Sequence, residues 1–212
     1  MNVDTTLFLS LFGFAFATCF TPGPNNFMLM SSGALFGFRR TLSHILGIQL
    51  GFMSLMAASV LGLGAVVLRM PWLIMVVKIA GAGWLCWLAF GFGVAARGGR
   101  DLDAANTEET RSRPLRFYEA ALFQWANPKG LIIALSASGA YLGISPAPSI
   151  RVLLICGAFT AMGTVSATTW TVIGNLLNQL LSTGRSARLL NLLMGFLLLA
   201  TAVIIMMTPA SA

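Results

Sequence analysis

A long stretch without any charged side chain, from Thr5 to Phe38, constrains this chain more than any other feature. In soluble domains about a quarter of the residues are charged, and these cover the surface. A helix of about 20 apolar residues is long enough to cross the hydrocarbon core of a bilayer. The whole chain is 57% hydrophobic and 9% charged, so the same reasoning extends beyond this stretch. We therefore expect an all-α integral membrane protein surrounded by the lipid bilayer.

Charged residues and turn residues divide the chain into six predicted membrane-spanning helices. The hydrophilic segment 97–116 separates two halves of three spans each, and we treat 1–212 as one transmembrane domain with repeats at about 1–96 and 117–212. The N-terminus MNVDTT lacks the positive charge of a signal peptide, so the first apolar run is predicted to be a retained span. The predicted spans are 5–38, 45–68, 72–96, 117–142, 152–174 and 189–207.

Two of these spans, the first and the fourth, are interrupted by residues that cannot continue a helix. The first interruption is Thr21-Pro22-Gly23-Pro24-Asn25-Asn26, and the second is Asn127-Pro128-Lys129-Gly130. They occupy matching positions in the two halves. Because three spans is an odd number, the second half enters the membrane from the opposite side. This is the inverted-repeat plan of many secondary transporters, whose substrate sites lie at discontinuous helices near the midplane.

The two interruptions are also the predicted binding site. A broken helix exposes backbone N–H and C=O groups that lipid cannot satisfy but a polar ligand can, and a helix N-terminus favours a carboxylate. Lys129 either pairs with a substrate carboxylate in a water-filled pathway or satisfies backbone carbonyls at the break. The asparagines likewise suit either a ligand or the loose backbone ends. The candidate substrate-binding residues are Thr21, Pro22, Gly23, Pro24, Asn25, Asn26, Asn127, Pro128 and Lys129.

Proton coupling is harder to place, because no Asp or Glu lies inside a predicted span away from its ends. Lys129 and Glu119 are the candidates for coupling. Glu119 lies about two turns before the second interruption, but a pairing with Arg116 at the i,i+3 spacing explains it equally well. Lys78 lies close to the start of the third span, so we expect it to snorkel outward to the interface. His44 is expected at a span entrance beside Arg40.

The distribution of Lys and Arg predicts the orientation. Basic residues are enriched in cytoplasmic connections, and the connections after spans one, three and five hold most of them, whereas the opposite side holds Arg69 and Arg151. Both termini are therefore predicted to face the periplasm. The residues on the cytoplasmic side are Arg39, Arg40, Arg97, Arg100, Arg111, Arg113, Arg116, Arg185 and Arg188.

Several other classes of function are disfavoured. The net charge of +7 fits cytoplasmic loops rather than nucleic-acid binding, because the basic residues are scattered between apolar runs. With a single histidine and no paired catalytic groups in the spans, we expect no enzyme, metal or cofactor. The three cysteines are expected to be packing residues. The GxxxG spacing of Gly47 and Gly51 predicts that another helix approaches closely there. Glycine-rich helix faces also allow the chain to form a homodimer. A channel or a scaffold remains the alternative to a transporter.

The motifs TPGPNN, FGFRR, HILGIQLG, KIAGAGWLCWLAF and NPKG, in this order along the chain, resemble the LysE/RhtB superfamily of amino-acid exporters. The resemblance implies a multi-pass efflux protein of the bacterial inner membrane with about six helices. It also implies export of an amino acid or a derivative, driven by the proton gradient as an antiporter. Within the superfamily the chain looks most similar to cysteine and O-acetylserine exporters, with homoserine, threonine and lysine exporters as relatives.

Overall fold

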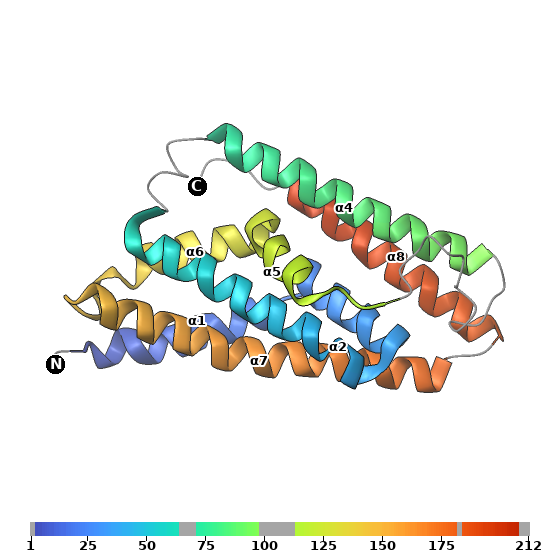
Figure 1. Cartoon of the computed structure of the whole chain (residues 1–212), viewed down its shortest axis with the longest axis horizontal. Helices are drawn as coiled ribbons and strands as arrows, with labels where there is room; N and C mark the ends of the chain where they lie inside the picture. The colour runs from blue at the N-terminus through green and yellow to red at the C-terminus, as the bar shows by residue number, and fades with distance from the viewer. Residues whose placement is uncertain (1–2, 64–70, 98–112, 182–183, 208–212) are drawn as a thin grey trace.

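The computed structural model describes residues 3–63, 71–97, 113–181 and 184–207, and within these ranges it contains helices and no strands (Figure 1). The predicted all-α class is confirmed. Most of the predicted hydrophilic loop and the end of the second span, 64–70, lie outside the described residues. The helices are α1 Thr5–Phe20, α2 Pro24–Ala58, a π-helical turn η1 Ser59–Leu63, α4 Pro71–Arg97, α5 Phe117–Ala126, α6 Pro128–Ala140, a 3₁₀ turn η3 Leu142–Ile144, α7 Pro148–Leu181 and α8 Gly184–Met207.

Both predicted interruptions are present as breaks between helices. α1 ends at Phe20 and α2 begins at Pro24, while α5 ends at Ala126 and α6 begins at Pro128. A proline in the first turn of a helix sacrifices no hydrogen bond, because its missing N–H would have had no partner within the helix. The same residue type that ends the preceding helix therefore begins the next one.

α2 folds back on itself at Gly37. The backbone there has φ 75° and ψ 169°, a region open essentially to glycine alone. The hydroxyl groups of Ser32 and Thr41 lie 3.0 Å apart, although residues nine positions apart in a straight helix would be separated by about 13 Å. The part of α2 before Gly37 thus completes the first predicted span, and the part after it forms the second span.

The last two helices extend beyond the predicted spans. α7 includes Arg151 and continues past Gly174 to Leu181, and α8 begins at Gly184 rather than Leu189. The predicted bounds were set by where the apolar residues end, and apolar residues mark only the part of a helix that lipid surrounds. The polar residues beyond these bounds, such as Asn and Gln, are compatible with a helix, so the helical hydrogen bonds continue past the end of the apolar stretch.

The main core forms where α7 packs against α1 and α2, with α6 beside them. Phe159 of α7 is 2% exposed, and its ring makes edge-on contacts with Phe14 of α1 and Phe52 of α2. A second cluster joins the α4–α8 pair to Phe27 and Met30 of α2. The first cluster thus joins α1, α2, α6 and α7, and the second attaches the α4–α8 pair to α2.

Gly47 and Gly51 make the close approach predicted for them, against α5. A Cβ on Gly47 would meet the carbonyl oxygen of Phe117, and one on Gly51 would lie 2.6 Å from Cα of Ala121. Such contacts require the backbones of α2 and α5 to touch, which only glycine allows here. The GxxxG pair thus serves a contact within the chain.

α1 and α6 lie antiparallel. The backbone N–H of Asp4, before α1, donates to the carbonyl of Ile144 beyond the end of α6 at 3.1 Å. At the other end of α1, Thr21 meets Lys129 at the start of α6. In Figure 1, α1 accordingly runs away from the end marked N and α6 runs back toward it. The two broken helices therefore bring their breaks to the same level of the molecule.

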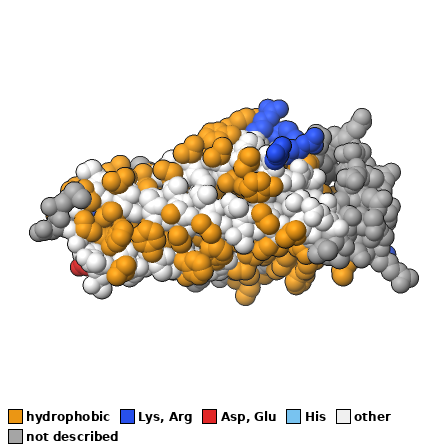
Figure 2. Space-filling view, turned by 90° about the horizontal axis from the view of Figure 1, so that it is seen from below, with side chains coloured by type: hydrophobic (Ala, Val, Ile, Leu, Met, Phe, Trp, Pro, Cys, Tyr) orange, Lys and Arg blue, Asp and Glu red, His pale blue; other side chains and the backbone are white. Residues whose placement is uncertain are grey.

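The outer surface is largely apolar. Large hydrophobic side chains such as Leu122, Leu153 and Phe196 are about two-thirds exposed. Figure 2 shows apolar groups spread over the part of this face that is not grey, with Lys and Arg gathered in one place. The stretches Pro24–Gly62 and Pro148–Gln179 are apolar and long enough to cross a membrane. This surface suits contact with lipid, since soluble monomers rarely expose apolar patches of this extent.

Candidate functional site

The two helix breaks meet through Lys129. Its Nζ donates a hydrogen bond to the carbonyl of Thr21, just past the end of α1. The side chain crosses directly over Gly23, where a Cβ would lie 2.7 Å from Cδ of Lys129 and 3.0 Å from its Nζ. A side chain at position 23 would therefore displace the lysine. The sequence leaves two interpretations open for Lys129, a substrate carboxylate or a backbone carbonyl as its partner. The structure shows a backbone carbonyl, and this carbonyl belongs to the first break, whereas Lys129 itself lies at the second.

Other polar side chains satisfy the remaining carbonyls at the end of α1. The Nδ2 group of Asn26 donates to the carbonyls of Cys19, at 3.1 Å, and Thr21, at 3.0 Å. The hydroxyl of Ser166 on α7 donates to the Cys19 carbonyl at 2.8 Å. The last carbonyls of a helix have no intrahelical donor, and inside a membrane they need one from elsewhere. Asn26 and Ser166 thus fix the end of α1 against α2 and α7.

Asn25 and Gln124 form a reciprocal amide pair between α2 and α5. Asn25 Nδ2 donates to Gln124 Oε1 at 2.7 Å, and Gln124 Nε2 donates back to Asn25 Oδ1 at 3.2 Å. Gln124 is fully buried and also donates to the carbonyl of Ala120 at 2.9 Å. The amide of Asn25 is therefore used mainly to fasten the break after α1 to the helix before the second break.

Asn127 caps the second break. Its Oδ1 accepts a hydrogen bond from the backbone N–H of Lys129 at 3.1 Å, as an N-cap asparagine does, and the residue is 2% exposed. The N-cap of α2, Gly23, has no side chain with which to cap that helix. The first N–H groups of α2 therefore point out of the helix without an intrahelical acceptor.

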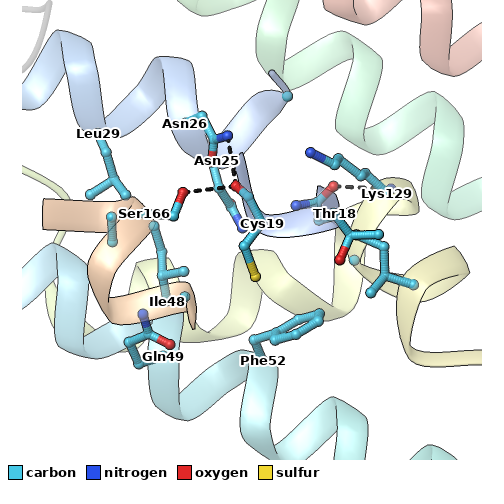
Figure 3. Close-up of a pocket in the computed structure, with 16 residues that line it drawn as sticks. Thr18, Cys19, Asn25, Asn26, Leu29, Ile48, Gln49, Phe52, Lys129 and Ser166 are labelled. Carbon is cyan, nitrogen blue, oxygen red and sulfur yellow. Dashed lines mark hydrogen bonds between the residues drawn. The ribbon is translucent and has the colours of Figure 1, made fainter. Parts of the chain in front are cut away.

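A cavity of about 70 Å³ lies where these groups converge (Figure 3). One water needs about 10–15 Å³, so the cavity has room for several waters or one small molecule. Of the predicted substrate-binding residues, five line it: Gly23, Asn25, Asn26, Asn127 and Lys129. The predicted site residues Thr21, Pro22, Pro24, Pro128 and Glu119 are not among its lining residues. The rest of the wall is formed by Thr18, Cys19, Leu29, Ile48, Gln49, Phe52, Gly130, Ile133, Gly163, Ser166 and Ala167.

The two sides of the cavity differ in chemistry. On one side are the ammonium group of Lys129 and the N-terminus of α2, both of which favour an anion. Lys129 has three N–H donors, and Thr21 accepts one of them, so others remain for a ligand. Leu29, Ile48 and Phe52 make much of the opposite wall apolar. The arrangement can hold a small molecule with a carboxylate at one end.

Glu119 lies at the N-terminus of α5. Its carboxylate accepts two hydrogen bonds from the guanidinium of Arg113, at 2.7 and 2.8 Å, and one from the backbone N–H of Arg116 at 2.8 Å. These bonds raise the pKa of Arg113 above its usual value. Glu119 thus contacts Arg116 through the backbone N–H of Arg116. The ion pair is formed with Arg113 instead, whose side chain reaches back to the first turn of α5.

Lys78 and His44 are both buried, contrary to the positions predicted for them. Lys78 is 3% exposed and donates to the carbonyl of Met206 in the last turn of α8, at 3.2 Å. The snorkelling prediction is therefore wrong: the free carbonyls at a helix C-terminus attract the ammonium inward. His44 is 2% exposed inside α2, because the helix after the turn at Gly37 begins earlier than predicted.

The sequence analysis missed several residues of the site. Gln124, Gln49 and Ser166 are polar residues inside otherwise apolar spans, and such residues usually mark functional or structural polar networks. That signal was present in the sequence. Cys19 packs against the main core, as predicted, and it also lines the cavity, with its sulfur near the centre of the view in Figure 3. Among the described residues no cluster of His, Cys, Asp and Glu suits a metal ion.

Comparison with known families places nearly the whole chain in one family. Residues 16–208, which include both breaks and every residue that lines the cavity, match the LysE type translocators. The chain belongs to this family. It is therefore a membrane transport protein, as the resemblance of its motifs predicts, and the apolar outer surface of its helices fits contact with lipid.

Individual relatives extend the match over nearly the whole chain. The cysteine/O-acetylserine efflux protein of Escherichia coli (strain K12) is 25% identical over 203 residues, which cover 93% of this chain and 96% of the relative. The protein of the same name from Salmonella paratyphi A is 25% identical over 200 residues, covering 94% and 97%. No solved structure matches the chain.

Proposed function

We propose that this protein is a secondary transporter that exports a small amino acid or an amino-acid derivative across the bacterial inner membrane. The observation that carries this proposal is the cavity at which both helix breaks meet, with Lys129 over Gly23 and the uncapped start of α2 beside it. A zwitterion fits this place, because its carboxylate meets the ammonium group and the helix N-terminus.

We propose cysteine or O-acetylserine as the substrate, or a related homoserine, threonine or lysine type. The names of the similar proteins from E. coli and Salmonella support the first pair. The small cavity also favours a short side chain. A long cationic side chain such as that of lysine would place a second ammonium group in a site that already contains Lys129.

We propose proton antiport with Lys129 as the titrating group. Lys129 contacts the cavity directly, so substrate binding and loss of its proton would affect each other. Glu119 was the second candidate for coupling. Its carboxylate receives three hydrogen bonds at the start of α5 and does not line the cavity, which favours a structural role.

We propose that the chain forms six spans arranged as two inverted repeats, with both termini in the periplasm. The antiparallel course of α1 and α6, and the proline that begins the helix after each break, support the inversion. Inverted repeats place a site between two halves that can rock relative to each other. A homodimer in the membrane stays a proposal that the glycine faces alone support.

Purified protein in liposomes tests the function. Vesicles are loaded with labelled cysteine, O-acetylserine or threonine, and release is measured with and without an imposed pH gradient. We expect release that saturates with substrate and is faster when protons can move in the opposite direction. Release that never saturates and ignores the pH gradient would support the alternative, a channel. Empty liposomes and the variant Lys129→Met, which lacks the ammonium group, are the controls.

A further inference from the structure

Gln49 presents a buried amide to the cavity. It lies on α2, less than one helical turn before Phe52, and is 8% exposed. The polar neighbours Asn25, Asn26 and Ser166 all hydrogen-bond to protein groups, but the side chain of Gln49 has no hydrogen-bond partner among the described residues. Burying a polar group without a partner costs free energy, so such a group in a binding cavity is typically satisfied when a ligand is present.

The absence of a side chain at Gly163 of α7 leaves room for the amide. A Cβ at Gly163 would lie 3.0 Å from Oε1 of Gln49 and 3.1 Å from its Nε2, so the glycine makes the space in which the amide lies. In Figure 3, Gln49 and Lys129 lie on opposite sides of the cavity, with Cys19 between them. A ligand whose carboxylate meets Lys129 therefore extends its other end toward Gln49.

We infer that Gln49 is a specificity-determining residue that hydrogen-bonds the polar side chain of the transported amino acid. The inference rests on the proposed function and specifies the class of substrate: a short side chain with a hydrogen-bonding group. Oε1 accepts from a thiol or a hydroxyl group, and Nε2 donates to an ester carbonyl. An apolar side chain of the same length leaves the amide unsatisfied, and the site discriminates against it for that reason.

Cysteine and 2-aminobutyrate provide the test, because they differ only in a thiol against a methyl group. Their release from proteoliposomes is compared for the wild type, for Gln49→Met, which keeps the size and removes the amide, and for Gln179→Met on the exposed end of α7 as the matched control. The wild type is expected to prefer cysteine. Gln49→Met should lower kcat/KM for cysteine roughly three- to tenfold, the effect of one hydrogen bond. It should raise kcat/KM for 2-aminobutyrate, because no amide is then left unsatisfied. Gln179→Met should behave as the wild type.

Gln49→Glu provides a second variant with a sharper expectation. Its carboxylate still accepts from a thiol but cannot donate to an ester, so it should retain transport of cysteine better than that of O-acetylserine. If both Gln49 variants melt like the wild type and lose cysteine and 2-aminobutyrate equally, the inference about Gln49 is overturned while the exporter stands. If the wild type releases no amino acid, the proposed function fails, and the inference fails with it.

Discussion

Lys129 has two roles that a substitution can separate, because its ammonium group both bonds Thr21 and faces the cavity. Lys129→Gln keeps an uncharged donor, whereas Lys129→Met removes the donor as well. A hydrogen bond to a charged group contributes about 1.5–3 kcal/mol, which corresponds to roughly a 10- to 150-fold change in affinity. We expect both variants to raise KM in the liposome assay by about this factor, with Lys129→Met also melting at a lower temperature.

Lys129→Arg is the control for this prediction, because it retains the positive charge. It should preserve more transport than Lys129→Gln does. An unchanged KM in Lys129→Gln would show that the ammonium group serves the backbone of the break alone and does not bind substrate.

In contrast to Lys129, we expect substitution of Glu119 to have little effect on either stability or transport. The side chains of Arg113 and Glu119 are 43% and 28% exposed, and ion pairs that water reaches contribute about 0–1 kcal/mol. Glu119→Gln should therefore change the melting temperature only slightly. The effect of a pH gradient on substrate release should stay as in the wild type, and Arg113→Gln should behave alike. Loss of the gradient effect in Glu119→Gln alone would instead make this carboxylate part of proton coupling.

At the scale of elements, the contact of α2 with α5 depends on the absence of a side chain at Gly51. A Cβ there would lie 2.6 Å from Cα of Ala121, and backbone cannot yield as a flexible side chain can. Overpacking of this kind typically costs about 1–3 kcal/mol. Gly51→Ala should thus lower the melting temperature in detergent and weaken transport, since α5 carries the Gln124 amide that fastens Asn25.

Gly157 on α7 is the matched control, because nothing lies within 4 Å of a Cβ added there. Gly157→Ala should leave stability unchanged or increase it by up to about 1 kcal/mol through helix propensity. If the two alanine variants melt alike, the close approach of α2 and α5 is not a stabilising contact.

The elements were predictable to the extent that local chemistry determines them. Pro24 and Pro128 marked both breaks in the sequence, since proline ends one helix and suits the first turn of the next. The ends of α7 and α8 were not predictable from hydropathy, which locates lipid contact rather than hydrogen bonding. In the site, Lys129 was predictable as a charge in an apolar span. Its contact with Thr21 and the pairing of Asn25 with Gln124 join residues far apart in the sequence, so they required the packed structure.

At the scale of the whole molecule, the two breaks have different chemical tasks. At the first, Asn26, Ser166 and Lys129 supply donors to the carbonyls at the end of α1. At the second, Asn127 supplies an acceptor to the start of α6. The first break therefore presents the uncapped start of α2, and the second presents an ammonium group on a capped helix. A zwitterionic ligand bound between them would contact both, so movement of one half relative to the other would change its affinity.

The orientation of the molecule in the membrane is the last prediction. Arg39 and Arg40 follow the turn at Gly37, and both are exposed, whereas Arg151 lies near the start of α7 and donates to Ser145. Because basic residues are retained on the cytoplasmic side, the turn at Gly37 should face the cytoplasm. Alkaline phosphatase fused after Ala212 should be active, since it requires the periplasm, and a fluorescent protein at that point should stay dark. A fusion at Asn106 should give the reverse pattern, and the opposite result at both positions would overturn the predicted orientation of the termini.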